Sequence, residues 1–384
     1  MGSVVIERLG DNIVSPIGLT STENLESILS GRSELRLRPG EFNLPEDCCA
    51  SLLDREAVEK LFKSEEGEKD YTFFEKLCIL SARHAIAESS IDPSASDTLF
   101  VLSTTKGNVD ELAVNLDSEK YYIGHSAGVI ARHFGNRNTP VVASNACISG
   151  VCAQISAVRQ LLSGRYRTAV VIGADVLSQF IISGFQSFKA LSQQPCRPYD
   201  RDRVGLNLGE AVGTLVLQIG EKREEIGDGT WIYVASAIHN DANHISGPSR
   251  TGEGSYRVLR DILDEIDPSE LAFVNTHGTA TAYNDEMESI ALHRAGLDTL
   301  PVNGLKGFYG HTLGAAGVIE TVLSMHAIDR GLVLPTRGFA TQGTTYAVNL
   351  SADTRSTDKK AFIKLLSGFG GSNAGIAWRK GGAR

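Results

Sequence analysis

The chain has 384 residues, of which 42% are hydrophobic and 22% are charged, and its formal net charge at pH 7 is −9. A chain of this length can bury a large core and form two or three domains of about 150 residues, so we expect a globular, soluble protein. The negative balance argues against a nucleic acid as the main partner, and residues 4–6 form an apolar run too short for a signal peptide or a membrane span.

The first half of the chain alternates apolar, β-branched runs with segments whose apolar residues recur at helical spacing. The predicted strands are residues 4–9, 98–102, 139–144, 168–173 and 213–218. The predicted helices are residues 22–29, 71–89 and 148–163, with a further helix before the strand at 139–144. Residues 31–69 are polar, charged and poorly periodic, so we expect them to form a surface excursion.

The second half of the chain begins this alternation again. The predicted strands are residues 231–238, 271–275, 302–303, 361–366 and 374–378, and the predicted helices are residues 255–266, 285–295 and 313–329. Each half reads as strand, helices, strand, helix and two strands, although no sequence identity recurs at a fixed period. We therefore divide the chain into residues 1–220 and 221–384, and we expect an α/β protein with mixed sheets between helices.

Cys147 lies at the predicted junction between the strand at 139–144 and the helix at 148–163. Free N–H groups and the positive end of the helix dipole favour a thiolate there, so the position suits a nucleophile. Taken alone, the position is better interpreted as a buried structural cysteine, but the histidines further along the chain reverse this preference. The six cysteines have neither metal-ligand spacing nor a disulfide framework, so we expect a reducing, cytoplasmic location and no disulfides.

Several motifs of the chain occur in the same order in one family of enzymes. They are Ser15-Pro16-Ile17-Gly18, Ala146-Cys147, Arg197-Pro198-Tyr199-Asp200 with Gly209-Glu210, His277-Gly278-Thr279-Ala280-Thr281 with Asp285, Lys306 with Gly310-His311 and Gly314-Ala315-Ala316-Gly317, and Gly368-Phe369-Gly370-Gly371-Ser372-Asn373-Ala374. Over nearly its whole length the chain resembles β-ketoacyl-acyl-carrier-protein synthases. Its Cys-His-His pattern resembles the elongating branch of these condensing enzymes rather than the initiating Cys-His-Asn branch.

The resemblance implies the thiolase fold, with two similar halves in five α-β-α-β-α layers, and a dimer. It implies an acyltransferase that performs decarboxylative Claisen condensation of an acyl group on Cys147 with malonyl-acyl carrier protein, in fatty-acid or in polyketide or polyene biosynthesis. No cofactor is implied, because the substrates are carried on the phosphopantetheine of acyl carrier protein. That carrier is the implied partner, beside a second identical subunit or a homologous ketosynthase-like subunit.

The two chemical steps need different groups. A nucleophile must first take the acyl group from a carrier thioester, and Cys147 suits that role. Decarboxylation of a malonyl unit then develops an enolate oxygen, and the resemblance assigns its two donors to His277 and His311 as neutral imidazoles. Such donors contribute about 3 kcal/mol each in comparable sites. The family's C-terminal loop implies that the backbone N–H groups of Cys147 and Phe369 hold the thioester oxygen.

Five further residues are expected to support these groups. Lys306 resembles the family's buried lysine, which we expect to pair with Glu210 and to orient the site. Thr279 and Thr281 either contact the pantetheine arm of the carrier or satisfy the backbone of their own loop. Asp285 either caps the following helix or holds this loop, because it lies at a predicted helix start.

Three positions depart from the residues usual in the family: Ile148, Leu206 and Ser367. The segment before Cys147 is also shorter than in typical fatty-acid elongation enzymes. These departures favour a specialised pathway, such as a polyketide or polyene made on discrete carriers. Arg203 and neighbouring basic residues are candidates for docking an acidic carrier.

Other activities remain open at this stage. A catalytically silent chain-length or structural partner would have no chemical need for the cysteine, both histidines and the lysine together. A thiolase would carry a second catalytic cysteine near its C-terminus, whereas the last cysteine of this chain is Cys196. Zinc binding by Cys147, His277 and His311 would bring together ligands far apart in sequence without a paired-ligand motif, so we expect no metal.

Overall fold

The computed structural model of the chain describes residues 4–114, 118–220, 227 and 229–381. In these residues ten strands form a mixed sheet with the order β11-β10-β14-β15-β9-β1-β8-β6-β4-β5. One group of five contains β1 (Val5–Val14), β8 (Ala211–Gly220), β6 (Thr168–Asp175), β4 (Thr98–Ser103) and β5 (Val141–Ala143). The other contains β9 (Trp231–Asn240), β15 (Ser372–Lys380), β14 (Ala361–Gly368), β10 (Leu271–Asn275) and β11 (Val302–Asn303).

The two groups share one pattern of strand directions. From β1 outward to β5 the successive pairings are antiparallel, antiparallel, parallel and parallel. The pairings from β9 outward to β11 follow the same order. The groups meet where β1 pairs with β9 through Glu7 and Ile232. The division at residue 220 stays a prediction, since residues 221–226 and 228 lie outside the described part of the chain.

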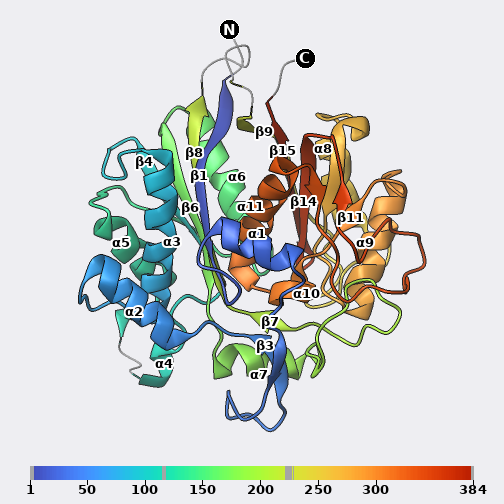
Figure 1. Cartoon of the computed structure of the whole chain (residues 1–384), viewed down its shortest axis with the longest axis horizontal. Helices are drawn as coiled ribbons and strands as arrows, with labels where there is room; N and C mark the ends of the chain where they lie inside the picture. Colours follow the sequence, from blue (N-terminus) through green and yellow to red (C-terminus); the bar gives the residue numbers. More distant parts are fainter. Residues whose placement is uncertain (1–3, 115–117, 221–226, 228, 382–384) are drawn as a thin grey trace.

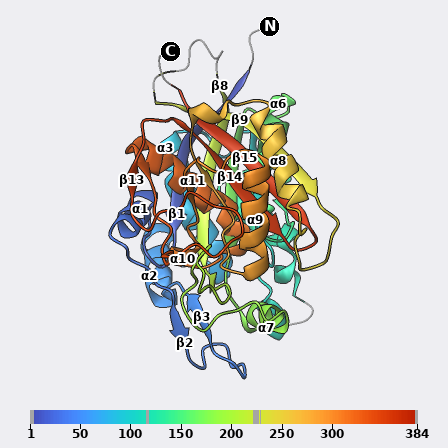
Figure 2. The same cartoon turned by 90° about the vertical axis from the view of Figure 1, so that its right-hand side faces the viewer.

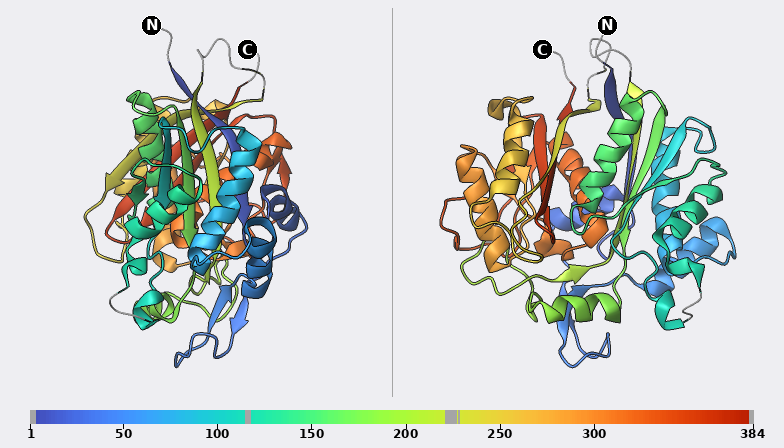
Figure 3. Two further views of the ribbon diagram at one scale, coloured as in Figure 1. Left: turned by 90° about the vertical axis from the view of Figure 1, so that its left-hand side faces the viewer. Right: turned by 180° about the vertical axis from the view of Figure 1, so that it is seen from behind.

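Helices separate and cover the two groups of strands. Between the groups lie α6 (Ser149–Leu162) and α11 (Ala316–Asp329), each of which contacts strands of both groups (Figure 1). The outer face of the first group is covered by α3 (Phe73–Ser89) and α5 (Ile123–His133), and α8 (Glu253–Leu263) and α9 (Ala282–Arg294) lie outside the second. Figure 3 shows the same order from behind, with α6 in green between the two groups. The five α-β-α-β-α layers expected of the thiolase fold are therefore present.

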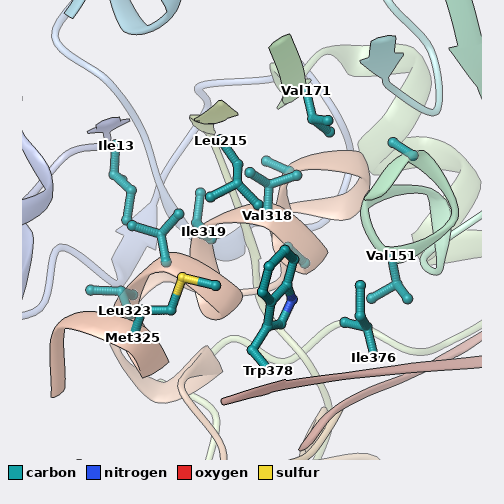
Figure 4. Packing of buried hydrophobic residues seen from close by; sticks show 14 of the residues in the cluster. Ile13, Val151, Val171, Leu215, Val318, Ile319, Leu323, Met325, Ile376 and Trp378 are labelled. Atoms are coloured by element: carbon teal, nitrogen blue, oxygen red, sulfur yellow. The ribbon is translucent and has the colours of Figure 1, made fainter. Parts of the chain in front are cut away.

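The central layer forms the largest apolar core. Val318 and Ile319 of α11 lie beside Leu215 of the first group, and Trp378 belongs to the other group of strands (Figure 4). The helices α6 and α11 also approach each other closely at their N-terminal ends. A Cβ atom on Gly150 would lie 2.8 Å from the Cα of Gly317, so any larger residue would force the helices apart. This close approach holds the first turn of α6, which follows Cys147, against the segment that follows His311.

The described residues contain further helices and strands. The helical ones are α1 (Ser21–Leu29), α2 (Arg55–Glu66), α4 (Glu111–Val114), η1 (Glu119–Tyr121), α7 (Gln179–Ser187), η3 (Pro268–Glu270), α10 (Lys306–Tyr309) and η4 (Leu313–Ala315). The strands are β2 (Arg36–Arg38), β3 (Cys48–Ser51), β7 (Leu208–Gly209), β12 (Leu332–Val333) and β13 (Arg355–Ser356). No helix among the described residues has the length and apolar character needed to cross a lipid bilayer.

The expectation that residues 31–69 form only a surface excursion was wrong in part. Strand β3 within this stretch is buried along its whole length and pairs in parallel with β7. The helix α2 buries Val58 and Phe62 against the rest of the protein. Helix α7, which we did not predict, shares an apolar cluster with β3 and β7, and it lies with β3 at one end of the molecule (Figure 2). The predicted helix at 313–329 is divided into η4 and α11.

A partly buried ion pair ties the end of α11 to β1. The Nε2 atom of His326 lies 2.9 and 3.1 Å from the two carboxylate oxygens of Asp11. Burial opposes the charged imidazole, but the hydrogen bond and the charge of Asp11 outweigh it and raise the pKa of His326 above its usual value. Burial likewise acts against the charged form of Asp11, yet His326 and Arg8 outweigh it and lower the pKa of that carboxyl group.

The replacement His326→Gln should destabilise the protein more at about pH 5.5 than at about pH 8.5. A histidine whose pKa is raised by folding adds stability that is complete below its unfolded pKa of about 6.5 and is lost as the pH rises through the folded value. At the lower pH Asp11 is still charged, and a hydrogen bond to a charged group contributes about 1.5–3 kcal/mol. Thermal unfolding followed by circular dichroism at both pH values measures the effect.

The matched control is His84→Gln, which removes a histidine 3.2 Å from Glu65 on the outer surface of α3. Exposed pairs of this kind contribute about 0–1 kcal/mol, so its melting temperature should stay near that of the wild type at either pH. An equal loss for His326→Gln at both pH values would contradict a role for the charged imidazole.

Candidate active site

Cys147 is presented by a strained turn between β5 and α6. Ala146 has a φ of 44°, a left-handed backbone conformation that is costly for a residue other than glycine. The hydroxyl of Ser149 holds the turn, because it donates to the carbonyl of Ala146 at 2.6 Å and accepts the N–H of Asn145 at 2.8 Å. The turn directs Cys147 into a cavity of about 960 Å³.

The structure brings both predicted histidines to this thiol. His277 follows the end of β10 and His311 follows α10, and the two rings lie edge to face with their centres 4.9 Å apart. One ring nitrogen of each histidine and the Sγ atom of Cys147 all lie within 4.8 Å of one another. All three side chains line the cavity, and each is less than a tenth exposed.

The surroundings of both histidines keep their rings neutral. Burial is the largest cause that lowers the pKa of His277 and His311 well below the usual value, followed by the charge of Lys306. The Nδ1 atom of His311 accepts the N–H of Leu313 at 3.2 Å, so the proton of the neutral ring resides on Nε2. That Nε2 atom and Nδ1 of His277 are buried and have no hydrogen-bond partner among the described residues. The site therefore offers at least one unused, uncharged N–H donor next to the thiol.

The protonation of Cys147 differs from the expectation for a helix N-terminus. Burial raises the pKa of Cys147 to about 11, although the charge of Lys306 and a hydrogen bond from the N–H of Phe369 act in the opposite direction. The side chain is only 6% exposed, and removal of water disfavours the thiolate more than these groups favour it. In the free protein at neutral pH the thiol is therefore protonated, and the predicted thiolate was wrong for this state.

Lys306 is buried as expected, but the pairing with Glu210 was wrong. The Nζ atom of Lys306 donates to Oε1 of Glu320 at 2.9 Å. Glu210 instead accepts the backbone N–H groups of Leu53 and Leu177, each at 2.9 Å, and lies 3.3 Å from Arg55. The reason is the position of α11: it lies between the groups of strands and carries Glu320 to Lys306, whereas Glu210 faces the segment that follows β3.

Two charged residues of this cluster were missed from the sequence. Glu320 is 2% exposed on α11 and also pairs with Lys364, whose side chain is fully buried on β14. The sequence feature that could have revealed them is a single charged residue within an otherwise apolar element, as in the strand Ala361-Phe362-Ile363-Lys364-Leu365-Leu366. A charge that cannot reach water needs a partner of opposite sign, so such positions predict buried ion pairs.

The loop after β10 is held by two carboxylates. Asp285 accepts the N–H of Thr279 at 3.0 Å and that of Tyr199 at 2.7 Å, so it holds the loop and does not cap α9. Burial raises the pKa of Asp285 to about 7. Glu288, which was not predicted, accepts the N–H of His277 at 2.7 Å and thereby fixes the backbone of a cavity residue.

Thr279 and Thr281 line the cavity and also serve their own loop. Their hydroxyl groups are 2.9 Å apart, and the hydroxyl of Thr281 caps α9 by accepting the N–H of Asn284. The helix cap that Asp285 was expected to supply thus comes from Thr281. Both threonines remain available to a ligand in the cavity, since only one hydroxyl proton is used between them.

Aromatic rings flank Phe369 at the mouth of the cavity. Its ring is stacked on that of Phe185 at 5.7 Å and meets that of Phe188 edge-on at 5.1 Å. Of the three residues that depart from the family pattern, Leu206 and Ser367 line the cavity, whereas Ile148 is fully buried in the central core. The substrate pocket is therefore affected directly at the first two positions.

The ligand atoms of Cys147, His277 and His311 are also the kind that zinc prefers. However, His311 uses the lone pair of Nδ1 for the N–H of Leu313 and holds its proton on Nε2. The charges of Lys306 and Lys364 already act on both histidines and disfavour a further cation. These groups fit hydrogen-bond donors to an anion better than they fit zinc ligands.

Comparison with known proteins identifies the family. The sequence matches the beta-ketoacyl synthase N-terminal domain over residues 3–223 and the C-terminal domain over residues 232–340. It is 25% identical to 3-oxoacyl-acyl-carrier-protein synthase 2 of Synechocystis over 98% of each protein. Identity to nodulation protein E of Rhizobium leguminosarum is 29%, over 66% of this chain and 65% of that protein.

A solved ketosynthase from Xenorhabdus doucetiae, in complex with its chain length factor, has the same fold. The TM-score is 0.86 at 22% sequence identity, and the match covers 98% of both chains. With both domain matches and this fold, the chain belongs to the β-ketoacyl synthase family.

Proposed function

We propose that this β-ketoacyl synthase condenses an acyl group carried on Cys147 with a malonyl unit delivered by acyl carrier protein. The observation that carries the proposal is the meeting of one thiol and two neutral imidazoles from distant segments in a single cavity. A nucleophile for acyl transfer and unused donors for an enolate oxygen are the groups that the two steps require.

The reaction balances with the groups of this site. In the first step the sulfur of Cys147 attacks the carrier thioester, a new thioester forms on Cys147, and the thiol of the carrier leaves with the proton. In the second step the malonyl thioester loses carbon dioxide and becomes an enolate, whose oxygen accepts hydrogen bonds from His277 and His311. The enolate carbon attacks the acyl carbon, the bond from that carbon to the sulfur of Cys147 breaks, and the sulfur leaves as a thiolate that takes up a proton from water. The N–H groups of Cys147 and Phe369 serve the oxygen of the acyl thioester.

A catalytically silent role is less well supported. A chain-length or structural partner needs the fold, but it has no use for a buried thiol surrounded by two neutral histidines and a buried lysine. The lysine in particular requires the buried carboxylate of Glu320 as its partner, and buried charges destabilise a protein unless they are fully paired.

The proposal is tested by supplying the purified protein with an acyl carrier and a malonyl carrier. Mass spectrometry should detect an acyl adduct on Cys147 and then a β-ketoacyl carrier two carbons longer than the starting acyl group. Release of free fatty acid without elongation would instead identify a hydrolase. Absence of any adduct with several acyl lengths would contradict the proposed function. Analysis of the adduct present after purification from the native host would narrow the natural acyl group and the pathway.

We further propose that the carrier docks at the mouth of this cavity. Lys189 and Arg250 line the mouth and are exposed, so they suit an acidic carrier. Arg203, which we expected to take this role, has a side chain only 8% exposed. Its guanidinium donates to the carbonyls of Asp200 and Gly343 at 3.0 and 2.7 Å, so it connects these two loop segments instead of facing a carrier.

The replacement Lys189→Glu should raise KM for the carrier by about tenfold at low salt and leave kcat nearly unchanged, because rim charges act mainly on association. Steady-state kinetics at two salt concentrations measures the effect. Lys360→Glu makes the same charge change at an exposed residue that directly precedes β14, at the end of the strand away from the cavity. This variant should leave KM unaltered. An equal rise of KM for both variants would assign the effect to net charge and contradict local docking.

We propose that a second subunit, identical or homologous, binds along the edge of the sheet formed by β5. Strand β5 is the last strand of the sheet order and has no second neighbour among the described residues, and the turn with Cys147 follows it directly. Unpaired strand edges invite pairing with another chain. A cytoplasmic location also belongs to this proposal, supported by six cysteines that are all unpaired thiols.

A further inference from the structure

Lys364 is a second buried lysine of the site, and no step described so far uses it. It lies on β14 opposite Asn275 of β10 and Ile376 of β15, and its side chain is fully buried. Its Nζ atom donates to the carbonyl of Thr276 at 3.0 Å and to Oδ1 of Asn275 at 2.6 Å. Thr276 directly precedes His277, so Lys364 holds the main chain at the root of that histidine.

The third partner of Lys364 links it to the other lysine. Its Nζ atom donates to Oε2 of Glu320, whose Oε1 accepts from Lys306 at 2.9 Å. One carboxylate on α11 thus lies between two ammonium groups from β14 and α10. The charges of both lysines lower the pKa of Glu320, which keeps it ionised although it is buried.

The charges near Lys364 nearly cancel when the charge of Lys364 itself is included. Glu320 of α11 and Glu288 of α9 act on it with negative charge, and Lys306 of α10 acts with positive charge. The neutral rings of His277 and His311 complete this environment, and β15 contributes only the apolar Ile376 opposite Lys364. Burial is the largest of the causes that lower the pKa of Lys364 to about 8.

We propose that Lys364 is a positioning residue for the malonyl half of the reaction, which acts by anchoring the carbonyl of Thr276 and by sharing Glu320 with Lys306. This inference rests on the proposed function. The malonyl unit enters as a carboxylate and passes through an enolate, so its decarboxylation depends on the position of His277 and on positive charge behind it. Transfer of a neutral acyl group to Cys147 makes no such demand.

The variant Lys364→Met removes the ammonium group and retains an unbranched side chain. It should lower kcat for conversion of malonyl carrier to acetyl carrier by about tenfold or more and alter the rate of acyl loading by less than about threefold. Lys360→Met, four residues earlier in the chain and exposed, is the matched control and should leave both rates unchanged. Both half-reactions are followed by mass spectrometry of the carrier and of the intact protein.

The pH profile separates this role from a merely structural one. In the wild type, decarboxylation should fall by about tenfold per pH unit once the pH exceeds the pKa of Lys364, because the charged form is the active one. In Lys364→Met the rate should be low and independent of pH over the same range, whereas a structural defect would scale the whole wild-type profile down. The wild-type measurement needs no variant, so it decides the point even where Lys364→Met does not fold.

A wild-type rate that stays constant to about pH 9.5 would overturn the role of Lys364. So would a folded Lys364→Met variant that decarboxylates at the wild-type rate. These results leave the proposed function intact, because the wild type still condenses. A wild type that neither loads nor decarboxylates removes the proposed function, and the role of Lys364 with it.

Discussion

The replacement Cys147→Ala should abolish acyl loading, with a loss of at least about a thousandfold, while the protein keeps its fold. Among the described residues that line the cavity, Cys147 is the only one that can form a thioester, and alanine adds no bulk where α6 and α11 approach each other closely. Intact-protein mass spectrometry after incubation with acyl carrier measures the loading. Condensation must be lost as well, because it starts from the loaded enzyme.

The control for this prediction is Cys152→Ala, which removes a half-buried thiol from α6, the helix that follows Cys147. Burial raises the pKa of Cys152 to about 11 as it does for Cys147, so the two thiols differ in position rather than in intrinsic acidity. Loading of the Cys152→Ala variant should match that of the wild type. An acyl adduct on the Cys147→Ala protein would show that another residue is the nucleophile.

Several strands of the sheet, among them β4, β6, β10 and β14, could be predicted from the sequence because they are buried on both faces. All residues of β6 are buried, and an apolar, β-branched run is then required at consecutive positions. Strand β3 was missed because its sequence, Cys48-Cys49-Ala50-Ser51, has no such signal. It is held by pairing with β7, which lies far along the chain, and local propensity carries no record of such a contact.

The candidate site divides in the same way. The motifs that resemble the family's pointed to Cys147, His277 and His311, and the structure places all three in one cavity. The carboxylate that pairs with Lys306 could not be chosen from the motif alone, since Glu210 and Glu320 both lie in apolar surroundings. The packing of α11 between the groups of strands decides for Glu320. The pKa of Cys147 was misjudged because the helix N-terminus is visible in the sequence, whereas the extent of burial is not.

The replacement His311→Ala should reduce decarboxylation of the malonyl carrier by about a hundredfold to a thousandfold and change acyl loading only a few-fold. The neutral ring holds its proton on Nε2, which faces the cavity without a partner among the described residues, so a developing enolate oxygen is its natural acceptor. Under the proposed function, acyl loading uses instead the N–H groups at Cys147 and Phe369, which the substitution leaves in place. Separate assays of the two half-reactions measure this difference.

The exposed His244→Ala variant serves as the control, because that histidine lines the same cavity but lies at its mouth. His311→Asn keeps an N–H donor near the original position and should recover part of the lost rate, which a packing defect would not allow. Equal losses in loading and decarboxylation would mean that His311 acts on Cys147, as a base for its thiol, or that the cavity has collapsed. The raised pKa of Cys147 makes the first of these a real competitor, since a protonated thiol must lose its proton during loading. Selective loss of decarboxylation is therefore the result that distinguishes a donor to the enolate from a base for the thiol.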